Sequence, residues 1–237
     1  MARHRDMNGG TARLAGRLAW ATVALGLVGV AVLVGRVVTT NDRRGPEPAP
    51  RTEGVIAARA ADSFDRPDHP SSLRGAPGGL PWRPEAGVWG VMGNQAGVSG
   101  PARGRSLAVV TLERADAEVQ VRLAKVVNDA GLVFRYQDRR NYWSVVAVPA
   151  YATWAITKTV DGKRESVANT GYSAVQDGTT VSVRLRGESI DVAVNGEVRK
   201  TISDGALARA RRVGMTAGEP GGRDARFDDF QVTLGPA

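Results

Sequence analysis

Cysteine is absent from this chain of 237 residues, which excludes disulfide bridges, a thiol nucleophile and metal sites ligated by cysteine. Histidine is scarce: His4 lies near the N-terminus, and His69 lies in a stretch rich in proline and serine. A Ser-His-Asp triad or a histidine-based zinc site would therefore depend on His69 alone. The glycines of residues 87–100 include no Gly-Lys-Ser or Gly-Lys-Thr, so they predict turns and not a phosphate-binding loop.

Long apolar runs are also missing, with one exception, the uncharged segment Leu18–Gly35. As a helix this segment would span about 27 Å, close to the hydrocarbon thickness of a bilayer. Because Arg36 can extend toward the interface, we predict a transmembrane helix over 18–38, preceded by a basic cytoplasmic leader over 1–17. The segment would act as a signal anchor in the cell membrane, with the C-terminal domain extracytoplasmic. The alternative is a cleaved signal peptide, although residues 37–40 make a poor cleavage site.

The net charge of +8 is uneven along the chain. Residues 1–51 contain eight arginines and three acidic residues, which leaves a charge of about +3 for the rest. Such a mildly basic remainder predicts no nucleic-acid partner. The cluster Arg209–Arg212 is interpreted as a solvated loop face, with contact to phosphate as the alternative. Residues 39–58, with three prolines, are predicted to form a linker.

Residues 59–237 show the alternation of apolar and polar residues that is typical of β-strands. Segments 119–123, 181–185 and 190–194 alternate most cleanly, and segment 131–148 predicts a hairpin whose turn is Asp138–Asn141. Turns are indicated at Asp161-Gly162, Asp177-Gly178 and Asn195-Gly196. The pattern predicts an all-β domain, a two-sheet antiparallel β-sandwich or jelly roll.

The order of several short motifs makes the resemblance more specific. These motifs are Asp62–Arg66, Trp82, Gly87–Trp89, the Phe134–Trp143 hairpin, Trp154 with Lys158, Val194–Gly196 and Ala225–Val232. In this order they resemble the concanavalin A-like lectin/glucanase superfamily in its laminin-G-like form, over roughly residues 60–235. The resemblance implies two curved sheets and carbohydrate bound on the concave face or at its rim.

Aromatic and polar side chains gather in and after the predicted hairpin. Aromatic faces stack on sugar rings, and arginine and glutamine donate hydrogen bonds to hydroxyl groups. By alternation, Leu132, Phe134 and Tyr136 should face the core while Arg135 and Gln137 face the ligand. The candidate carbohydrate-binding residues are Arg135, Gln137, Trp143, Tyr151, Trp154 and Lys158. The alternative is that these aromatic residues fill the core of the sandwich.

The last predicted strand has an irregular spacing, because Phe227 lies three residues before Phe230. Both can face the core only if a β-bulge lies near Asp228 and Asp229. In glucanases of the superfamily a matching aspartate holds a structural calcium ion. The resemblance therefore implies a Ca²⁺ site at Asp229 and Asp228, with backbone carbonyls near Phe64 and Gly90 as further ligands. The alternative is that the two carboxylates pair with Arg66 or Arg226.

The glucanase branch requires a Glu-x-Asp-x-Glu strand, and segment Glu113–Glu118 is the nearest match. It fails because Glu113 lies on the wrong face relative to Asp116 and Glu118. We therefore expect no enzyme, and a lectin-like domain that binds a cell-envelope or extracellular glycan. The alternatives are a protein-interaction or structural sandwich in an envelope assembly, with an envelope protein as partner, and a glycan hydrolase of unrecognised type.

Overall fold

A computed structural model describes residues 55–56, 58–73 and 80–235. They belong to the second of two compact units, Pro50–Ala237. The predicted leader and the predicted span 18–38 lie outside the described residues. Within the part of the chain that is described, no helix is long and apolar enough to cross a membrane.

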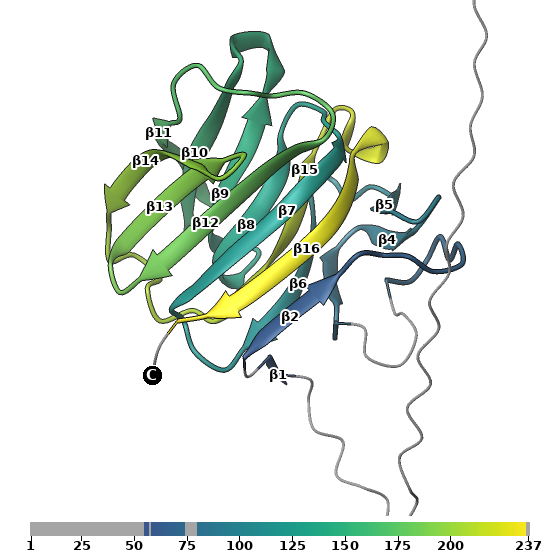
Figure 1. The fold of residues 1–237 in the computed structure, drawn as a ribbon, viewed down its shortest axis with the longest axis horizontal. Helices are drawn as coiled ribbons and strands as arrows, with labels where there is room; N and C mark the ends of the chain where they lie inside the picture. Colours follow the sequence, from purple (N-terminus) through teal and green to yellow (C-terminus); the bar gives the residue numbers. More distant parts are fainter. Residues whose placement is uncertain (1–54, 57, 74–79, 236–237) are drawn as a thin grey trace, which may run out of the picture. The chain divides into compact units, whose positions relative to one another are not determined.

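Two β-sheets face each other across one core, which confirms the predicted sandwich (Figure 1). The first sheet has the order β1-β6-β15-β8-β9-β10-β11, and β3 also pairs with β6. Its strands are β1 (Val55–Ile56), β3 (Arg83–Ala86), β6 (Arg105–Leu112), β8 (Ala130–Asp138), β9 (Asn141–Val148), β10 (Thr153–Val160), β11 (Lys163–Asn169) and β15 (Arg212–Gly218). The pairing is antiparallel except for β1 with β6, where Val55 lies opposite Thr111.

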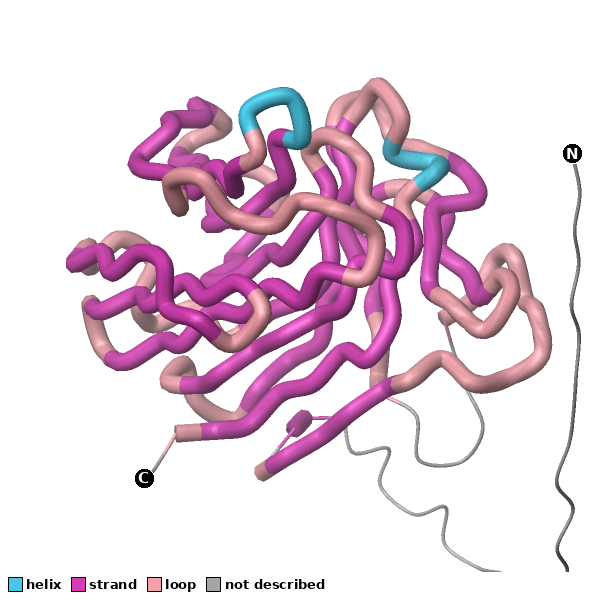
Figure 2. The backbone as a smooth tube through the Cα atoms, turned by 45° about the horizontal axis from the view of Figure 1, so that its top comes forward, coloured by secondary structure: helices cyan, strands magenta, loops and turns pink. Residues whose placement is uncertain are grey.

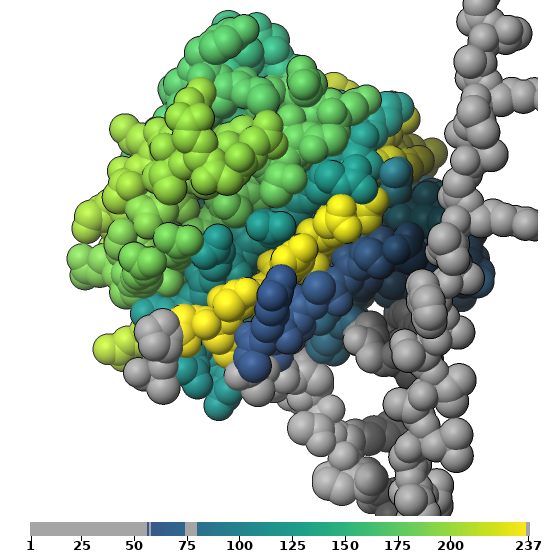
Figure 3. All heavy atoms as spheres, in the orientation of Figure 1, coloured from purple at the N-terminus to yellow at the C-terminus, as the bar shows by residue number. Residues whose placement is uncertain are grey.

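The second sheet has the order β14-β13-β12-β7-β16-β5-β4, and β2 also pairs with β16. Its strands are β2 (Arg59–Asp62), β4 (Val88–Val91), β5 (Ala96–Gly100), β7 (Ala117–Lys125), β12 (Thr179–Arg186), β13 (Ser189–Val194), β14 (Glu197–Ser203) and β16 (Arg226–Leu234). In Figure 3 β16 lies between β2 and the strands of the sheet centre. Two short 3-10 turns, η1 (Pro149–Tyr151) and η2 (Gly222–Asp224), lie in loops between strands (Figure 2).

Alternation decides which side chains form the core. In β7, β12 and β13 the apolar residue at every second position is buried, as the sequence predicts. Strand β6 is apolar on both faces: Ala108, Val110 and Leu112 join the main core, while Leu107 and Val109 join a second cluster. This second cluster lies on the opposite face of the first sheet and also contains Ala86, Val133, Tyr136 and Tyr142. We call that face the outer face of the first sheet.

The predicted turns at Asn195-Gly196 and Asp161-Gly162 are confirmed, because both residues of each pair have positive φ. Asn195 and Gly196 have φ of 50° and 82°, and Asp161 and Gly162 have φ of 51° and 80°. Successive positive φ values are the requirement of a type I′ hairpin turn. The predicted turn between β8 and β9 is also present, and there the Asp138 carboxylate accepts hydrogen bonds from the Arg140 backbone and the Asn141 amide.

Two β-bulges change the direction of side chains in the long strands. The predicted bulge of β16 is confirmed: pairing with β7 shifts between Asp228 and Gln231, and Asp229 has φ of 46°. Both Phe227 and Phe230 are therefore fully buried in the main core.

The second bulge lies in β8, where Arg135 also has φ of 46° and the pairing with β9 shifts after Phe134. The predicted assignment of faces is wrong beyond this point. Tyr136 belongs to the second cluster on the outer face, and not to the main core with Leu132 and Phe134.

Candidate functional site

Three of the six predicted sugar-binding side chains are buried. Trp143 and Trp154 have no exposed surface, and Arg135 is 1% exposed. The expectation that these side chains face a ligand is therefore wrong for the structure described, because the bulge and the sandwich core enclose them. Gln137 and Tyr151 are exposed, and Lys158 is partly exposed.

Arg135 holds backbone carbonyls together instead of facing solvent. Its guanidinium donates hydrogen bonds to the carbonyl oxygens of Gly187 (2.6 Å), Asp204 (2.5 Å) and Ala206 (3.3 Å). Burial lowers the pKa of this guanidinium, and the carboxylates of Asp204, Asp116 and Glu188 oppose that shift. The left-handed backbone at Arg135 directs the side chain to this position, and the carbonyls satisfy the buried cation.

Residues 204–211 form the loop between β14 and β15, which we call the 204–211 loop. Trp143 donates its indole N–H to the Ala206 carbonyl at 3.1 Å. The Lys158 ammonium lies 2.8 Å from the Asp204 carboxylate and 5.4 Å from the Trp143 ring centroid. Three predicted ligand-binding residues, Arg135, Trp143 and Lys158, thus lie together, but they contact this loop and not a free surface.

The pKa values of both partners of this ion pair, Lys158 and Asp204, are shifted. The hydrogen bond to Asp204 raises the pKa of Lys158, with burial acting against it. Burial favours the neutral form of Asp204, but hydrogen bonds from Lys158 and the Ala206 N–H and the charge of Arg135 outweigh it and lower the pKa of Asp204. The pair is therefore ionised at neutral pH and fixes the base of the loop.

An arginine-lined cleft of about 630 Å³ lies on the outer face of the first sheet, beside the second cluster. We call it the arginine cleft. Its lining comes from five separate elements: β3, the end of β6, the end of β8, the 204–211 loop and the start of β15. The lining residues are Arg83, Thr111, Tyr136, Gln137, Arg209, Ala210, Arg211 and Arg212.

One arginine of the cleft is fixed by its neighbours. The Arg212 guanidinium lies 4.8 Å from the Tyr136 ring centroid and 3.0 Å from the Glu85 carboxylate, and it also donates to the Gln137 carbonyl. Burial raises the pKa of the Tyr136 phenol, and the Glu85 carboxylate adds to this rise. Tyr136 therefore stays a neutral phenol, and Arg212 is held in a fixed position in the cleft lining.

Sequence reasoning assigned the arginines of the 204–211 loop to a solvated face and did not associate them with Gln137. The Leu112 N–H donates to the Arg211 carbonyl at 2.8 Å, which holds the loop against β6. The four arginines meet only through pairing of strands that are distant in sequence. The one signal in the sequence was the density of positive charge at Arg209–Arg212.

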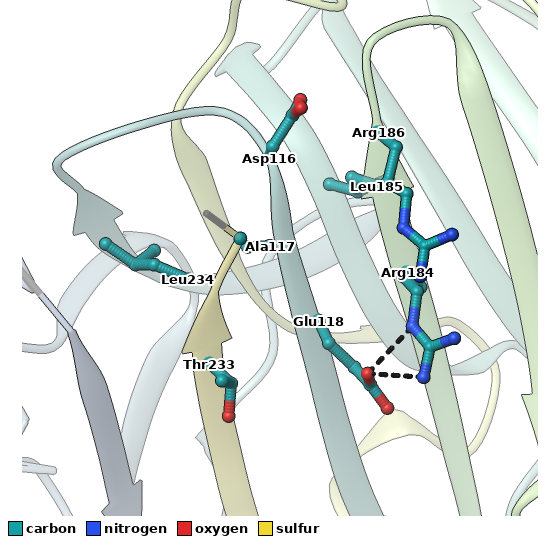
Figure 4. A pocket seen from close by; sticks show the side chains of 9 residues that line it. Asp116, Ala117, Glu118, Arg184, Leu185, Arg186, Thr233 and Leu234 are labelled. Atoms are coloured by element: carbon teal, nitrogen blue, oxygen red, sulfur yellow. Dashed lines mark hydrogen bonds and ion pairs between the residues drawn. The ribbon is translucent and has the colours of Figure 1, made fainter. Parts of the chain in front are cut away.

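A second hollow, of about 400 Å³, lies over β7, β12 and β16 on the other sheet (Figure 4). Its charges are balanced, with Asp116 and Glu118 against Arg184 and Arg186. Glu118 pairs with Arg184 at 2.8 Å, and the Asp116 carboxylate accepts the Gly187 N–H at 2.9 Å. Asp116 and Glu118 of the incomplete glucanase-like segment thus already have partners within the protein.

Asp228 and Asp229 lie beside each other at the β16 bulge, and both pair with Arg122, at 2.8 Å for Asp229. Neither Arg66 nor Arg226 is the partner; Arg66 pairs with Asp62. Across the described ranges, no group of three or more acidic or histidine side chains could hold a metal ion. A guanidinium at these carboxylates fits a cation poorly, so the structural calcium ion stays a prediction.

Two exposed tyrosines, in the loops that follow β9 and β11, form a third candidate contact surface. Tyr151 is 78% exposed and Tyr172 is 86% exposed. The loops are joined where the Ser173 N–H donates to the Ala152 carbonyl at 2.9 Å. Tyr172 was not among the predicted residues, because no alternation marks a loop residue.

No family model matches the sequence, and no match to a curated protein was found. Solved structures resemble the fold. The transglycosylase Crh5 aligns with a TM-score of 0.52 at 11% identity, over 78% of this chain and 87% of its own. A mutant of the GH43 protein BlXynB from Bacillus licheniformis aligns with a TM-score of 0.51 at 13% identity, over 73% of this chain and only 38% of its own. The carbohydrate-binding module CBM66 from Bacillus subtilis gives 0.49 at 13% identity, over 65% and 92%.

At these identities the likeness shows the fold alone. The chain has a two-sheet antiparallel β-sandwich fold like that of these two structures. This agrees with the two-sheet fold that the resemblance implies.

Proposed function

We propose that this protein is a membrane-anchored, extracytoplasmic domain that binds a glycan in the arginine cleft and catalyses no reaction. The fold supports the glycan-binding part of this proposal, since a transglycosylase has a similar fold; that the domain catalyses no reaction rests on the incomplete carboxylate motif at Glu113–Glu118. The membrane anchor would be the segment 18–38, on the sequence argument alone.

The arginine cleft is the observation that carries the proposal. The Gln137 amide and the Thr111 hydroxyl each offer both a donor and an acceptor, and the arginines add further donors. Sugar hydroxyls need such mixed partners. The volume of about 630 Å³ lies within the range of small-molecule sites. A single contact of this kind would have a Kd on the order of millimolar, and display of many copies on a membrane would strengthen it.

A glycan array probed with the full-length chain tests the proposal. We expect binding to a defined set of glycans, and loss of most of that binding in Gln137→Ala, because Gln137 is an exposed residue of the cleft lining. Arg186→Ala is the matched control, since Arg186 is exposed on the other sheet. Absence of binding to every glycan on the array would contradict the proposal.

The exposed tyrosines favour a second candidate function, recognition of an envelope protein. Tyr151 and Tyr172 are both more than three-quarters exposed on joined loops, and tyrosine is enriched in protein–protein interfaces. The double variant Tyr151→Ala/Tyr172→Ala separates the two functions. If it abolishes co-purification of a protein partner and leaves glycan binding intact, the second function is supported.

The anchor and the orientation have their own test. Membrane fractionation of cells should place the full-length chain with the membrane, and external protease should remove the C-terminal domain from intact cells. A chain found only in the soluble fraction would contradict the anchor.

A further inference from the structure

The arginine cleft has an excess of positive charge. Four guanidinium groups line it, and its described lining contains no carboxylate. Glu85, behind the lining, pairs with Arg212 and lies 3.9 Å from Arg83. One carboxylate therefore compensates part of the charge of two arginines and leaves the others uncompensated.

The arginines of the cleft differ in the contacts that they already make within the protein. The Arg83 side chain is 64% exposed, with only its distant contact to Glu85. Arg211 is exposed and donates one hydrogen bond, to the Glu113 carbonyl at 3.0 Å. Arg209 is exposed, and no described residue pairs with it. Arg83 and Arg209 are thus available to a ligand without loss of an existing strong contact.

The basic surface continues beyond the arginine cleft. A neighbouring hollow of about 320 Å³ on the same face is lined by Arg103, Arg139 and Tyr142, and by Arg105, whose guanidinium pairs with Asp129. Tyr142 lies 6.0 Å from Tyr136, centroid to centroid, so the two hollows adjoin across this pair of rings. The two rings are buried, so a chain-like ligand that extends beyond the arginine cleft would pass over them and meet Arg103 and Arg139.

Guanidinium groups bind carboxylate, sulfate and phosphate oxygens through paired, charge-assisted hydrogen bonds. From the uncompensated charge and the free guanidiniums we infer that the arginine cleft selects anionic glycans, whose sugar units carry carboxylate or sulfate groups. This inference rests on the proposed glycan-binding function. Arg83 and Arg209 bind the anionic group, while Gln137 and Thr111 bind hydroxyls.

Matched pairs of probes test the inference with the full-length chain at about 0.15 M salt, where charges more than about 8 Å apart are screened. One pair is trigalacturonate and its methyl ester, in which each carboxylate is converted to an uncharged ester. The other pair is dextran sulfate and dextran. Inorganic polyphosphate is the anion without a sugar. Calorimetry gives each affinity, and thermal unfolding verifies that each variant is folded.

We expect at least one anionic probe to bind on the order of 10-fold more tightly than its neutral partner, since each charge-assisted pair contributes more than a neutral one. The double variant Arg83→Ala/Arg209→Ala should abolish this difference, whereas Arg186→Ala, which removes a charge from the other sheet, should retain it. The trigalacturonate pair reports carboxylate selectivity, and the dextran pair reports sulfate selectivity.

Equal binding of charged and neutral partners, unchanged in the double variant, would overturn the inference and leave the proposed function standing. The same holds if Arg186→Ala weakens anionic binding as much as the double variant does. Binding of polyphosphate with no binding of any carbohydrate would overturn the proposed function as well.

Discussion

Replacing Arg135 by methionine tests whether this residue serves the fold or a ligand. Methionine has a similar reach but donates no hydrogen bond, so the carbonyls of Gly187 and Asp204 would lose their short bonds of 2.6 and 2.5 Å. Each buried acceptor left without a donor costs about 1–3 kcal/mol. Removing the buried cation offsets part of this lost free energy, because the desolvation of a charge no longer opposes folding.

The balance predicts that Arg135→Met lowers the free energy of unfolding by about 3 kcal/mol. For a domain of this size such a loss lowers Tm by roughly 6–12 °C. Tryptophan fluorescence is a suitable signal, because Trp143 donates to the same loop. Arg184→Met is the control: its side chain is 42% exposed in a surface ion pair, so the change should cost less than about 1 kcal/mol.

A Tm within about 2 °C of the parent protein would refute the structural role of Arg135. The same result accompanied by loss of glycan binding would return Arg135 to the ligand-binding role that the sequence suggested. A lower Tm together with weaker binding would be consistent with the structure, because Arg135 supports the loop that carries Arg209.

Three further changes give separate outcomes. The folded pKa of Asp204 is depressed below 3.8, so its stabilisation is present at neutral pH and is lost as pH falls through that pKa. In urea titrations the parent should therefore exceed Asp204→Asn by about 1 kcal/mol at pH 7 and lose that advantage below about pH 4; a constant difference would exclude the ion pair with Lys158. A calcium ion that binds at Asp229 must displace Arg122. The Arg122→Ala variant should therefore show a larger rise in Tm than the parent when Ca²⁺ is added. If neither Ca²⁺ nor EDTA changes the Tm of either protein, the site is excluded. Gly131→Ala would place a methyl group against a backbone carbonyl of β9 and should cost about 1–3 kcal/mol, so an unchanged urea midpoint would contradict the close approach of β8 and β9.

Much of the fold follows from local patterns in the sequence. The alternation in β7 and β12 identified the buried face because the other face is polar. The bulge in β16 was predictable because Phe227 and Phe230 are both too apolar for a solvated face. In these places one face of a strand differs in chemistry from the other.

Strand β8 gave no such signal, and there the prediction failed. Both of its faces are buried, so a slip of one residue exchanges apolar side chains between two apolar environments. Arg135 adopts a left-handed backbone without being glycine or asparagine, so its conformation depends on the carbonyls it binds. The arginine cleft was equally hidden, because its lining meets only through long-range strand pairing.

The shortest strand determines how far the arginine cleft can lie from the start of the domain. Val55 of β1 pairs with Thr111, and Thr111 lines the arginine cleft. If segment 18–38 anchors the chain, residues 39–54 extend at most about 58 Å before this pairing. The cleft then samples a thin layer above its own membrane, where ligands on the same cell have a high effective concentration. Lengthening those residues would widen that layer without altering the cleft.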